Sequence, residues 1–514
     1  MANSLAPESG HRSDASGDSP LSMDISGEMH TVGRQPSVLS ALYWAAGGRF
    51  AGQLISWLIT LWVIRILAPA DYALMALAMV FIAACALFDE VGLGSMITRA
   101  RELDETSLRK AFGIVLTIKT ALFGVLLVAA PAVGWLYASE ELVPLVRLLA
   151  FNFLASALGV IPRALLERHM AFQKLMTAEV AATLTAAATT LTLALLGHGV
   201  WALAAGALSF TVVRTAIVNM LSPFVRPPIF STRGMREFLT FGGTVSLERI
   251  LWYVYSQADI VIASKLIGAE ALGFYVVGKH LASLPAQKIS PVIQEVMFPA
   301  FARIQADRER VGRSLLLGIN ALTVLSCPAL FGMAVVAPDL IKVALGERWV
   351  PAALPLQTYS LILPLGMVSG IILSALKAVG RPDLSLRNVA LGSALMIAGF
   401  VVGSGWGLAG LSLAWLLVYP VYFLATVASS SHALGTTPRA LLARIGRSLF
   451  GGVLMMGAVA AVGVHTEHML PNALLNLITL VVVGAAVYLA VMLAFGRATL
   501  VDTANLLRQR RAPA

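Results

Sequence analysis

Residues 245–264 read VSLERILWYVYSQADIVIAS, a stretch that is long and apolar enough to cross a bilayer and yet contains Glu248, Arg249 and Asp259. A helix needs about 20 mostly apolar residues to cross roughly 30 Å of hydrocarbon. A charged side chain at the centre of such a helix costs about 2.5–3.5 kcal/mol on insertion scales. The stretch therefore predicts a membrane helix whose charges face other helices or water instead of lipid.

The composition of the whole chain also indicates a membrane protein. Of its 514 residues, 58% are hydrophobic and only 12% are charged, which lies outside the usual range of soluble globular proteins. Cys85 and Cys327, the two cysteines, sit in apolar runs, and this excludes a disulfide framework. The net charge of +10 comes from basic residues spread through short loops. Because they form no single patch, we expect no nucleic-acid partner.

Apolar stretches of membrane-spanning length recur from Ser40 to Phe495. There are about fourteen by length and hydropathy, which predicts an all-α integral membrane protein. Their approximate ranges are 40–66, 72–97, 111–137, 144–166, 176–197, 200–223, 238–267, 271–300, 314–338, 353–377, 385–404, 407–430, 447–465 and 473–495.

Lysine and arginine are distributed very unevenly among the connections. The loops after even-numbered spans, together with the C-terminal tail, carry roughly 23 of them, whereas those after odd-numbered spans carry about three, counted as the positive-inside rule requires. Cytoplasmic loops hold the excess of basic residues. We therefore expect both termini in the cytoplasm, with residues 1–37 as a disordered N-terminal tail that lacks a signal peptide and residues 497–514 as the C-terminal tail.

The first six spans resemble the next six. RILAPADYALMALA, from Arg65, matches KLIGAEALGFYVVG, from Lys265, and EVGLGSMITR, from Glu90, matches EVMFPAFAR, from Glu295. This predicts two six-helix lobes, 38–236 and 237–432, related by a pseudo-twofold axis along the membrane normal, followed by two further helices in 433–496. Transporters built from such repeats bind their substrate between the halves.

Polar residues form stripes along three of the predicted helices. Residues three, four or eleven positions apart share a helix face. The stripes are Glu248, Trp252, Tyr255 and Asp259 in the seventh span, Lys279, Ser283, Gln287, Ser290 and Gln294 in the eighth, and Arg49, Gln53, Ser56 and Thr60 in the first. One interpretation is that the charges only pair with one another and hold helices together. The other, which the whole set favours, is a hydrated and net basic cavity that accepts an anion such as phosphate.

These stripes supply the candidate site residues. The substrate-binding candidates are Arg49, Arg249, Lys279, Lys288, Arg65, Gln53 and Arg214, and the candidates for a coupling ion or for gating are Glu248, Asp259, Glu295 and Asp89. We expect no catalytic residue and no cofactor. We also expect no metal site, because His465 and His468 alone are a weak metal signal. Coupling to H⁺ or Na⁺ stays open.

Several segments together resemble the polysaccharide transporter branch of the multidrug, oligosaccharidyl-lipid and polysaccharide exporter superfamily. They are ILAPADYALMALA with DEVGLGSMITR, SQADIVIASKLIGAEALGFYVVGKHLASLP, VMFPAFARIQADRERV, and LGERWVPAALPLQTYS with LKAVGRPDLSLR. The resemblance covers nearly all of residues 38–496. It implies a flippase in the bacterial inner membrane that moves an undecaprenyl-diphosphate-linked oligosaccharide to the periplasmic leaflet, with membrane lipids, a polysaccharide polymerase and a chain-length regulator as partners.

Three other functions are alternatives for a chain with this pattern. A lipid II flippase shares the fold implied by the resemblance, and a multidrug antiporter of the same superfamily prefers cationic substrates that suit a basic cavity poorly. A membrane polymerase or ligase needs catalytic groups in a sizeable extramembrane loop, and the connections here are too short for one. The chain also lacks a GxxxxGK[ST] motif, so no ATPase of its own is expected.

Overall fold

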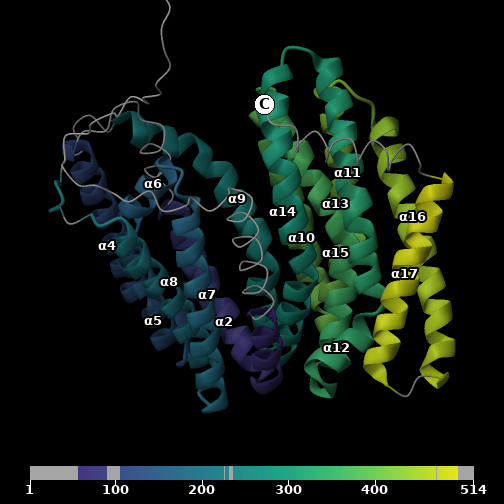
Figure 1. Cartoon of the computed structure of the whole chain (residues 1–514), viewed down its shortest axis with the longest axis horizontal. Coiled ribbons are helices and arrows are strands. Elements are labelled where there is room, and N and C mark those ends of the chain that lie inside the picture. Colours follow the sequence, from purple (N-terminus) through teal and green to yellow (C-terminus); the bar gives the residue numbers. More distant parts are fainter. Residues whose placement is uncertain (1–55, 90–104, 225, 231–235, 470–471, 496–514) are drawn as a thin grey trace, which may run out of the picture. The chain divides into compact units, whose positions relative to one another are not determined.

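The apolar spans fold as long α-helices in the computed structural model (Figure 1). The structure describes residues 56–89, 105–224, 226–230, 236–469 and 472–495. The predicted tails, 1–37 and 497–514, and most of the first span lie outside these ranges. In the part that is described, each of the fourteen predicted spans corresponds to helical residues, and the all-α membrane fold class is confirmed.

The helix bounds follow the predicted spans closely. In chain order they are Ser56–Ile66, α2 (Pro69–Asp89), α4 (Glu105–Leu136), α5 (Leu142–Ala157), α6 (Val160–Arg168), α7 (Phe172–Leu195), α8 (Val200–Leu221), α9 (Arg236–Leu266), α10 (Ala269–Ile304), α11 (Arg308–Val335), α12 (Ala337–Leu345), α13 (Ala353–Ala378), α14 (Pro382–Ser404), α15 (Gly407–Ser430), α16 (Pro438–Met469) and α17 (Ala473–Phe495).

Most of these helices are long enough to cross a membrane. Among the described residues, ten are also apolar enough, or eleven if the pair α5 and α6, bent by 46°, counts as one span. The helices α9 and α10, with 31 and 36 residues, measure roughly 45–55 Å at 1.5 Å per residue. They carry the charged stripes, so they are less apolar than the other spans.

The connection between α11 and α13 contains structure that the sequence did not predict. The short helix α12 is followed by a 3₁₀ helix, η1 (Glu347–Ala352). Gly346 joins them with a φ of +95°, a conformation that glycine adopts without the steric cost of a Cβ. This connection folds back onto the helices and buries Trp349 completely.

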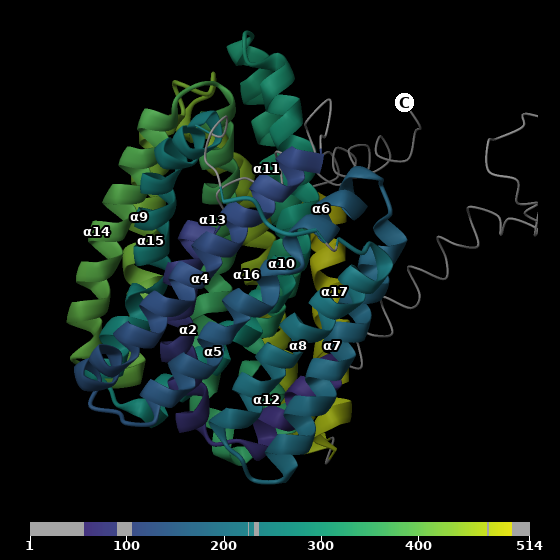
Figure 2. The same ribbon diagram turned by 90° about the vertical axis from the view of Figure 1, so that its left-hand side faces the viewer.

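The helices pack in two sets along the chain. The helices α4 to α8 contact one another, α9 to α17 contact one another, and α2 contacts both α5 of the first set and α9 and α10 of the second. Figures 1 and 2 show the helices within each set running side by side. The predicted lobe boundary, between residues 236 and 237, falls at the first residue of α9, and the division into two lobes stays a prediction.

The helix α2 and the second set make a close backbone contact where α2 and α10 begin. A Cβ added to Gly273 would lie 1.9 Å from the carbonyl oxygen of Pro69, so only glycine permits this backbone contact. Beside it, the buried ring of Trp349 packs edge-on against the rings of Tyr72 and Phe274, with both centroid distances 5.7 Å. The first half of the chain is thus joined to the second through an apolar contact at the starts of these helices.

Replacing Gly273 with alanine is expected to destabilise the fold by forcing α2 and α10 apart. Overpacking of this kind costs about 1–3 kcal/mol. Gly124 in α4 is the matched control, since a Cβ there would meet nothing within 4 Å. Gly124→Ala should raise the unfolding temperature slightly, because alanine is the better helix former by about 1 kcal/mol. Thermal unfolding of the detergent-solubilised variants measures both effects, and an equal stabilisation by Gly273→Ala would contradict the contact.

Candidate functional site

A cavity of about 990 Å³ lies among the helices of the second half of the chain. Its described lining comes mainly from α9, α10 and α13, with Val389 of α14 and Trp415 and Tyr419 of α15 completing it. This volume is typical of the larger ligand sites in proteins. The cavity is therefore the strongest candidate site among the described residues.

The polar wall of the cavity is the stripe of polar residues that the sequence predicts on one face of α10. Lys279, Ser283, Gln287, Ser290 and Gln294 all line the cavity. The prolines 285 and 291 lie within the same helix, and each removes a backbone N–H from the helical hydrogen-bond pattern. Freed carbonyl groups at membrane depth are tolerated where they face protein or a water-filled space. The sequence of α10 thus suits a helix that borders a hydrated cavity.

Lys279 forms an ion pair with Asp259 at the inner part of the cavity. Its ammonium group donates to Asp259 Oδ2. The hydroxyl of Tyr275 donates to the same oxygen at 2.5 Å, and Trp415 Nε1 donates to the Tyr275 hydroxyl oxygen at 2.7 Å. The Asp259 side chain is fully buried, whereas 17% of the Lys279 side chain is exposed. A chain of hydrogen bonds therefore holds α9, α10 and α15 together and leaves the lysine at the cavity surface.

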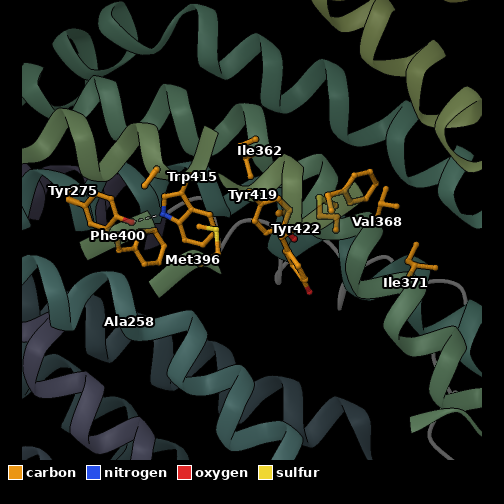
Figure 3. Close-up of a cluster of buried hydrophobic side chains, with 14 of the residues drawn as sticks. Ala258, Tyr275, Ile362, Val368, Ile371, Met396, Phe400, Trp415, Tyr419 and Tyr422 are labelled. Carbon is orange, nitrogen blue, oxygen red and sulfur yellow. Dashed lines mark hydrogen bonds between the residues drawn. The ribbon is translucent and has the colours of Figure 1, made fainter. Parts of the chain in front are cut away.

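Aromatic rings surround the ammonium group of Lys279. The centroids of the Tyr275, Tyr359 and Trp415 rings lie 5.9, 5.5 and 5.3 Å from Nζ. Cations are attracted to ring faces at such distances. Figure 3 shows the hydroxyl of Tyr275 directed at the ring nitrogen of Trp415, with Tyr419 and Tyr422 following along the same cluster. These rings lower the cost of keeping a charge inside the membrane.

The lining residues place the two ends of the cavity. Lys279 and Tyr359 mark what we call the inner end, and Lys377, on the last turn of α13, marks what we call the mouth. Near the inner end, Val277, Leu281 and Trp349 belong to one buried apolar cluster. This cluster packs beside the cavity toward the starts of α10 and α13. The mouth lies at the other ends of these helices.

Three of the predicted site residues lie elsewhere. Arg214 of α8 approaches Glu179 of α7 at 3.9 Å and lies 5.1 Å from the centroid of the Phe210 ring, within the first half. Lys288 is on another face of α10, where Nζ lies 6.0 Å from the Trp57 ring centroid. Arg65 is exposed near the end of the helix Ser56–Ile66. The described lining of the cavity includes none of these three.

The other candidates lie outside the part of the chain whose side chains are described. Arg49 and Gln53 precede it, and Glu248, Arg249, Glu295 and Asp89 belong to helices in which those side chains are not described. Their assignment, and a basic cavity that extends to the first span, stay predictions.

Four further residues of the site are not among those predicted from the sequence. Tyr275 precedes Lys279 by four residues, one helical turn, so the spacing could have placed it on the same face. Tyr359 and Trp415 come from α13 and α15, and no local pattern brings them to Lys279. Lys377 occurs in a segment that carried the resemblance, but only the helix bounds place it at the mouth.

Comparisons of the sequence agree on one group of proteins. Residues 63–354 match the model of a family described as polysaccharide biosynthesis protein. The lipopolysaccharide biosynthesis protein WzxC of Escherichia coli is 25% identical over 69% of this chain and 73% of its own length. The succinoglycan biosynthesis transport protein ExoT of Rhizobium meliloti is 24% identical over 88% and 92%, respectively. The teichuronic acid biosynthesis protein TuaB of Bacillus subtilis is 26% identical over 78% and 83%.

Solved structures share the fold. The lipid II flippase MurJ in an inward closed conformation superimposes with a TM-score of 0.69 and 13% identity, over 88% of this chain and 99% of that one. An inward-facing multidrug resistance transporter of the MATE family gives a TM-score of 0.55 and 16% identity, over 80% and 98%. At these identities the likeness concerns the fold alone. The shared fold and the family match together confirm the resemblance noted in the sequence.

Proposed function

Because this chain belongs to the polysaccharide biosynthesis protein family, we propose that it is a flippase for a lipid-linked oligosaccharide. In this proposal an undecaprenyl-diphosphate-linked repeat unit moves from the cytoplasmic to the periplasmic leaflet by alternating access. The cavity of α9, α10 and α13 receives the hydrophilic part while the lipid stays in the bilayer. No covalent chemistry is needed, which agrees with ExoT, a relative named as a transport protein.

The chemistry of the cavity is the observation that carries the proposal. Its wall offers amides and hydroxyls from Gln287, Ser290 and Gln294, aromatic rings from Tyr359 and Trp415, and an ammonium group. Amides and hydroxyls can donate to and accept from sugar hydroxyls, and cationic side chains bind phosphate and carboxylate. A cationic drug finds no Asp or Glu among the described lining residues, so a sugar substrate fits better.

The distribution of charged and aromatic residues supports an orientation. The basic loops after even-numbered spans support an orientation with both termini in the cytoplasm of the cell and the mouth of the cavity on the cytoplasmic side. Four tryptophans are exposed at the opposite helix ends, where such residues sit at a membrane interface. They are Trp62, Trp135, Trp201 and Trp406. In this orientation the protein lies in the inner membrane with its cavity accessible from the compartment in which repeat units are made.

Deletion of the gene tests the function. We expect the polymer to disappear from the cell surface and its lipid-linked repeat unit to accumulate in the cytoplasmic leaflet, both reversed by the wild-type gene. Mass spectrometry of the lipid extract identifies the sugar. Viable deletion cells would separate this function from lipid II flipping. Normal polymer export without accumulation would refute the proposal.

A variant of the cavity wall tests the site. Gln287→Leu removes an amide from the wall and should lower polymer export about fivefold, the equivalent of one hydrogen bond of about 1 kcal/mol. The matched control is Gln173→Leu, an exposed position at the start of α7, which should export normally. Equal export by both variants at equal protein levels would show that the wall does not contact the cargo.

A further inference from the structure

The ion pair of Asp259 and Lys279 borders the cavity through one partner. Lys279 is among the residues that line the cavity, and 17% of its side chain is exposed. Asp259 does not belong to the described lining, and its side chain is fully buried. A molecule that enters the cavity therefore meets the ammonium group and not the carboxylate.

The ammonium group of Lys279 can receive an oxyanion from the cavity side. An ammonium group has three N–H donors, and among the described residues the acceptor that it reaches is Asp259 Oδ2. The described lining contains no Asp or Glu, so no like charge in this part of the wall repels the oxyanion. Cationic side chains bind phosphate and carboxylate oxygens through such donors.

The ion pair is electrically neutral, and an oxyanion would change this balance. Lys279 is ten residues into α10, which is about 15 Å along the helix and hence inside the span. Asp259, Lys279 and an added oxyanion would together carry a net negative charge at this depth. A buried charge without compensation is costly, and the group concerned usually changes its protonation state instead. Uptake of one proton would restore neutrality.

Asp259 is the group that is placed to hold this proton. Its Oδ2 accepts from Lys279 and from Tyr275. Tyr255, Tyr275 and Tyr359 interact electrostatically with Asp259, but phenol groups are already protonated near neutral pH. Lys279 is also protonated as the cation of the pair. Among these side chains, the carboxylate is thus the one that can accept a proton.

The helices α2 and α14 also pack against α9. The ionisable side chains described on these two helices are Asp71, Tyr72, Cys85, Asp383 and Arg387. Asp71 accepts from the backbone N–H of Ala68, and Asp383 pairs with Arg381, so both carboxylates are engaged elsewhere. In the described lining, His280 is the other side chain that can take up a proton near neutral pH. A variant of His280 separates its contribution from that of Asp259.

We propose that an oxyanion of the cargo binds at Lys279 together with one proton, which Asp259 holds until the oxyanion leaves. This inference rests on the proposed function and names the ion that accompanies the cargo. Because the ammonium group contacts both the carboxylate and the cavity, it can pass a proton to Asp259 and regain one from water in the cavity. On release, Asp259 returns its proton and the ion pair forms again. The oxyanion is a phosphate of the diphosphate or the carboxylate of an acidic sugar.

The pH dependence of anion binding tests this exchange. Isothermal titration calorimetry on the purified protein in detergent gives the Kd of two probes. Methyl farnesyl diphosphate carries the diphosphate without a sugar, and glucuronate carries a sugar carboxylate without a lipid. The charge of both probes is constant from about pH 6 to about pH 8, so any proton taken up in this range belongs to the protein. Titrations in buffers with different ionisation enthalpies count the protons, and the probe that binds identifies the oxyanion.

We expect the Kd of wild-type protein to rise about tenfold for each pH unit, with one proton taken up per anion bound, because low pH favours binding that consumes a proton. Asp259→Asn should bind about tenfold more tightly at pH 8, since Lys279 then has no carboxylate partner, and should take up no proton. The matched control is Asp383→Asn, which changes an exposed paired carboxylate outside the cavity and should behave as wild type. His280→Gln should also keep the proton uptake.

Several outcomes would overturn the inference. They are a wild-type Kd that does not depend on pH, the absence of binding by both probes, and proton uptake that persists in Asp259→Asn or disappears in His280→Gln. The wild-type titration needs no variant to fold. The proposed function is judged separately by the deletion strain, because accumulation of the repeat unit together with pH-independent binding would keep the flippase and reject the accompanying proton.

Discussion

Asp259→Asn is expected to lower the stability of the folded protein by about 3 kcal/mol, the lower end of the range for breaking a buried ion pair. The change is isosteric, so packing is preserved, but the ammonium group of Lys279 loses the carboxylate to which it donates. A lysine charge at membrane depth costs about 2.5–3.5 kcal/mol when it is not compensated. The unfolding temperature of the purified protein in detergent measures the loss.

The double variant distinguishes a structural pair from a functional one. Asp259→Asn combined with Lys279→Met removes both charges, and we expect most of the lost stability to return because no buried charge is left alone. Polymer export should nevertheless stay low, since the cavity then lacks its inner ammonium group. Full export by the double variant would show that the pair only holds α9 and α10 together. An unchanged unfolding temperature in Asp259→Asn would contradict the pairing itself.

Trp415→Ala should have the second largest effect on stability. The side chain is only 4% exposed, and its ring contacts Tyr255, Tyr359, Phe400 and Tyr419 at centroid distances of 4.9–6.2 Å. Within a membrane, helices associate mainly through van der Waals packing, so the cost comes from the cavity left behind and from the lost hydrogen bond. We expect on the order of 2–3 kcal/mol, measured as the fall in unfolding temperature.

Two further variants separate the contributions of packing and of the hydrogen bond to this loss of stability. Trp415→Phe keeps most of the packing but removes the Nε1 donor to Tyr275, and should cost about 1 kcal/mol. Trp135→Ala is the matched control, because this tryptophan is 84% exposed and should change stability little. A loss at Trp135 as large as that at Trp415 would mean that tryptophan removal acts through the detergent and not through the cluster.

The sequence predicted the helices well because each membrane span must satisfy its backbone hydrogen bonds internally. A long apolar run in a membrane has few alternatives to a helix. The polar stripe from Lys279 to Gln294 was also predictable, since residues on one helix have a fixed spacing whatever surrounds them. The structure places all five of its residues at one cavity.

Contacts between distant helices were not predictable in the same way. Asp259 and Lys279 were both candidates, but their pairing depends on how α9 and α10 are packed together. Tyr359 and Trp415 are 80 and 136 residues beyond Lys279 in the chain, and only tertiary structure brings their rings to the ammonium group. Arg214, a basic residue in an apolar helix, was a candidate for substrate binding. In the structure it faces Glu179 in its own half of the chain.

The apolar contact at the starts of α2 and α10 has a thermodynamic consequence for the proposed transport cycle. In the proposed cycle, opening the cavity to the periplasm would separate Tyr72 of α2 from Trp349 of η1, which exposes apolar surface to water. Hydration of apolar surface raises the heat capacity. Breaking this contact therefore adds a positive heat-capacity change to the opening step, and this contribution makes the logarithm of the equilibrium constant curve with inverse temperature instead of following a straight van 't Hoff line.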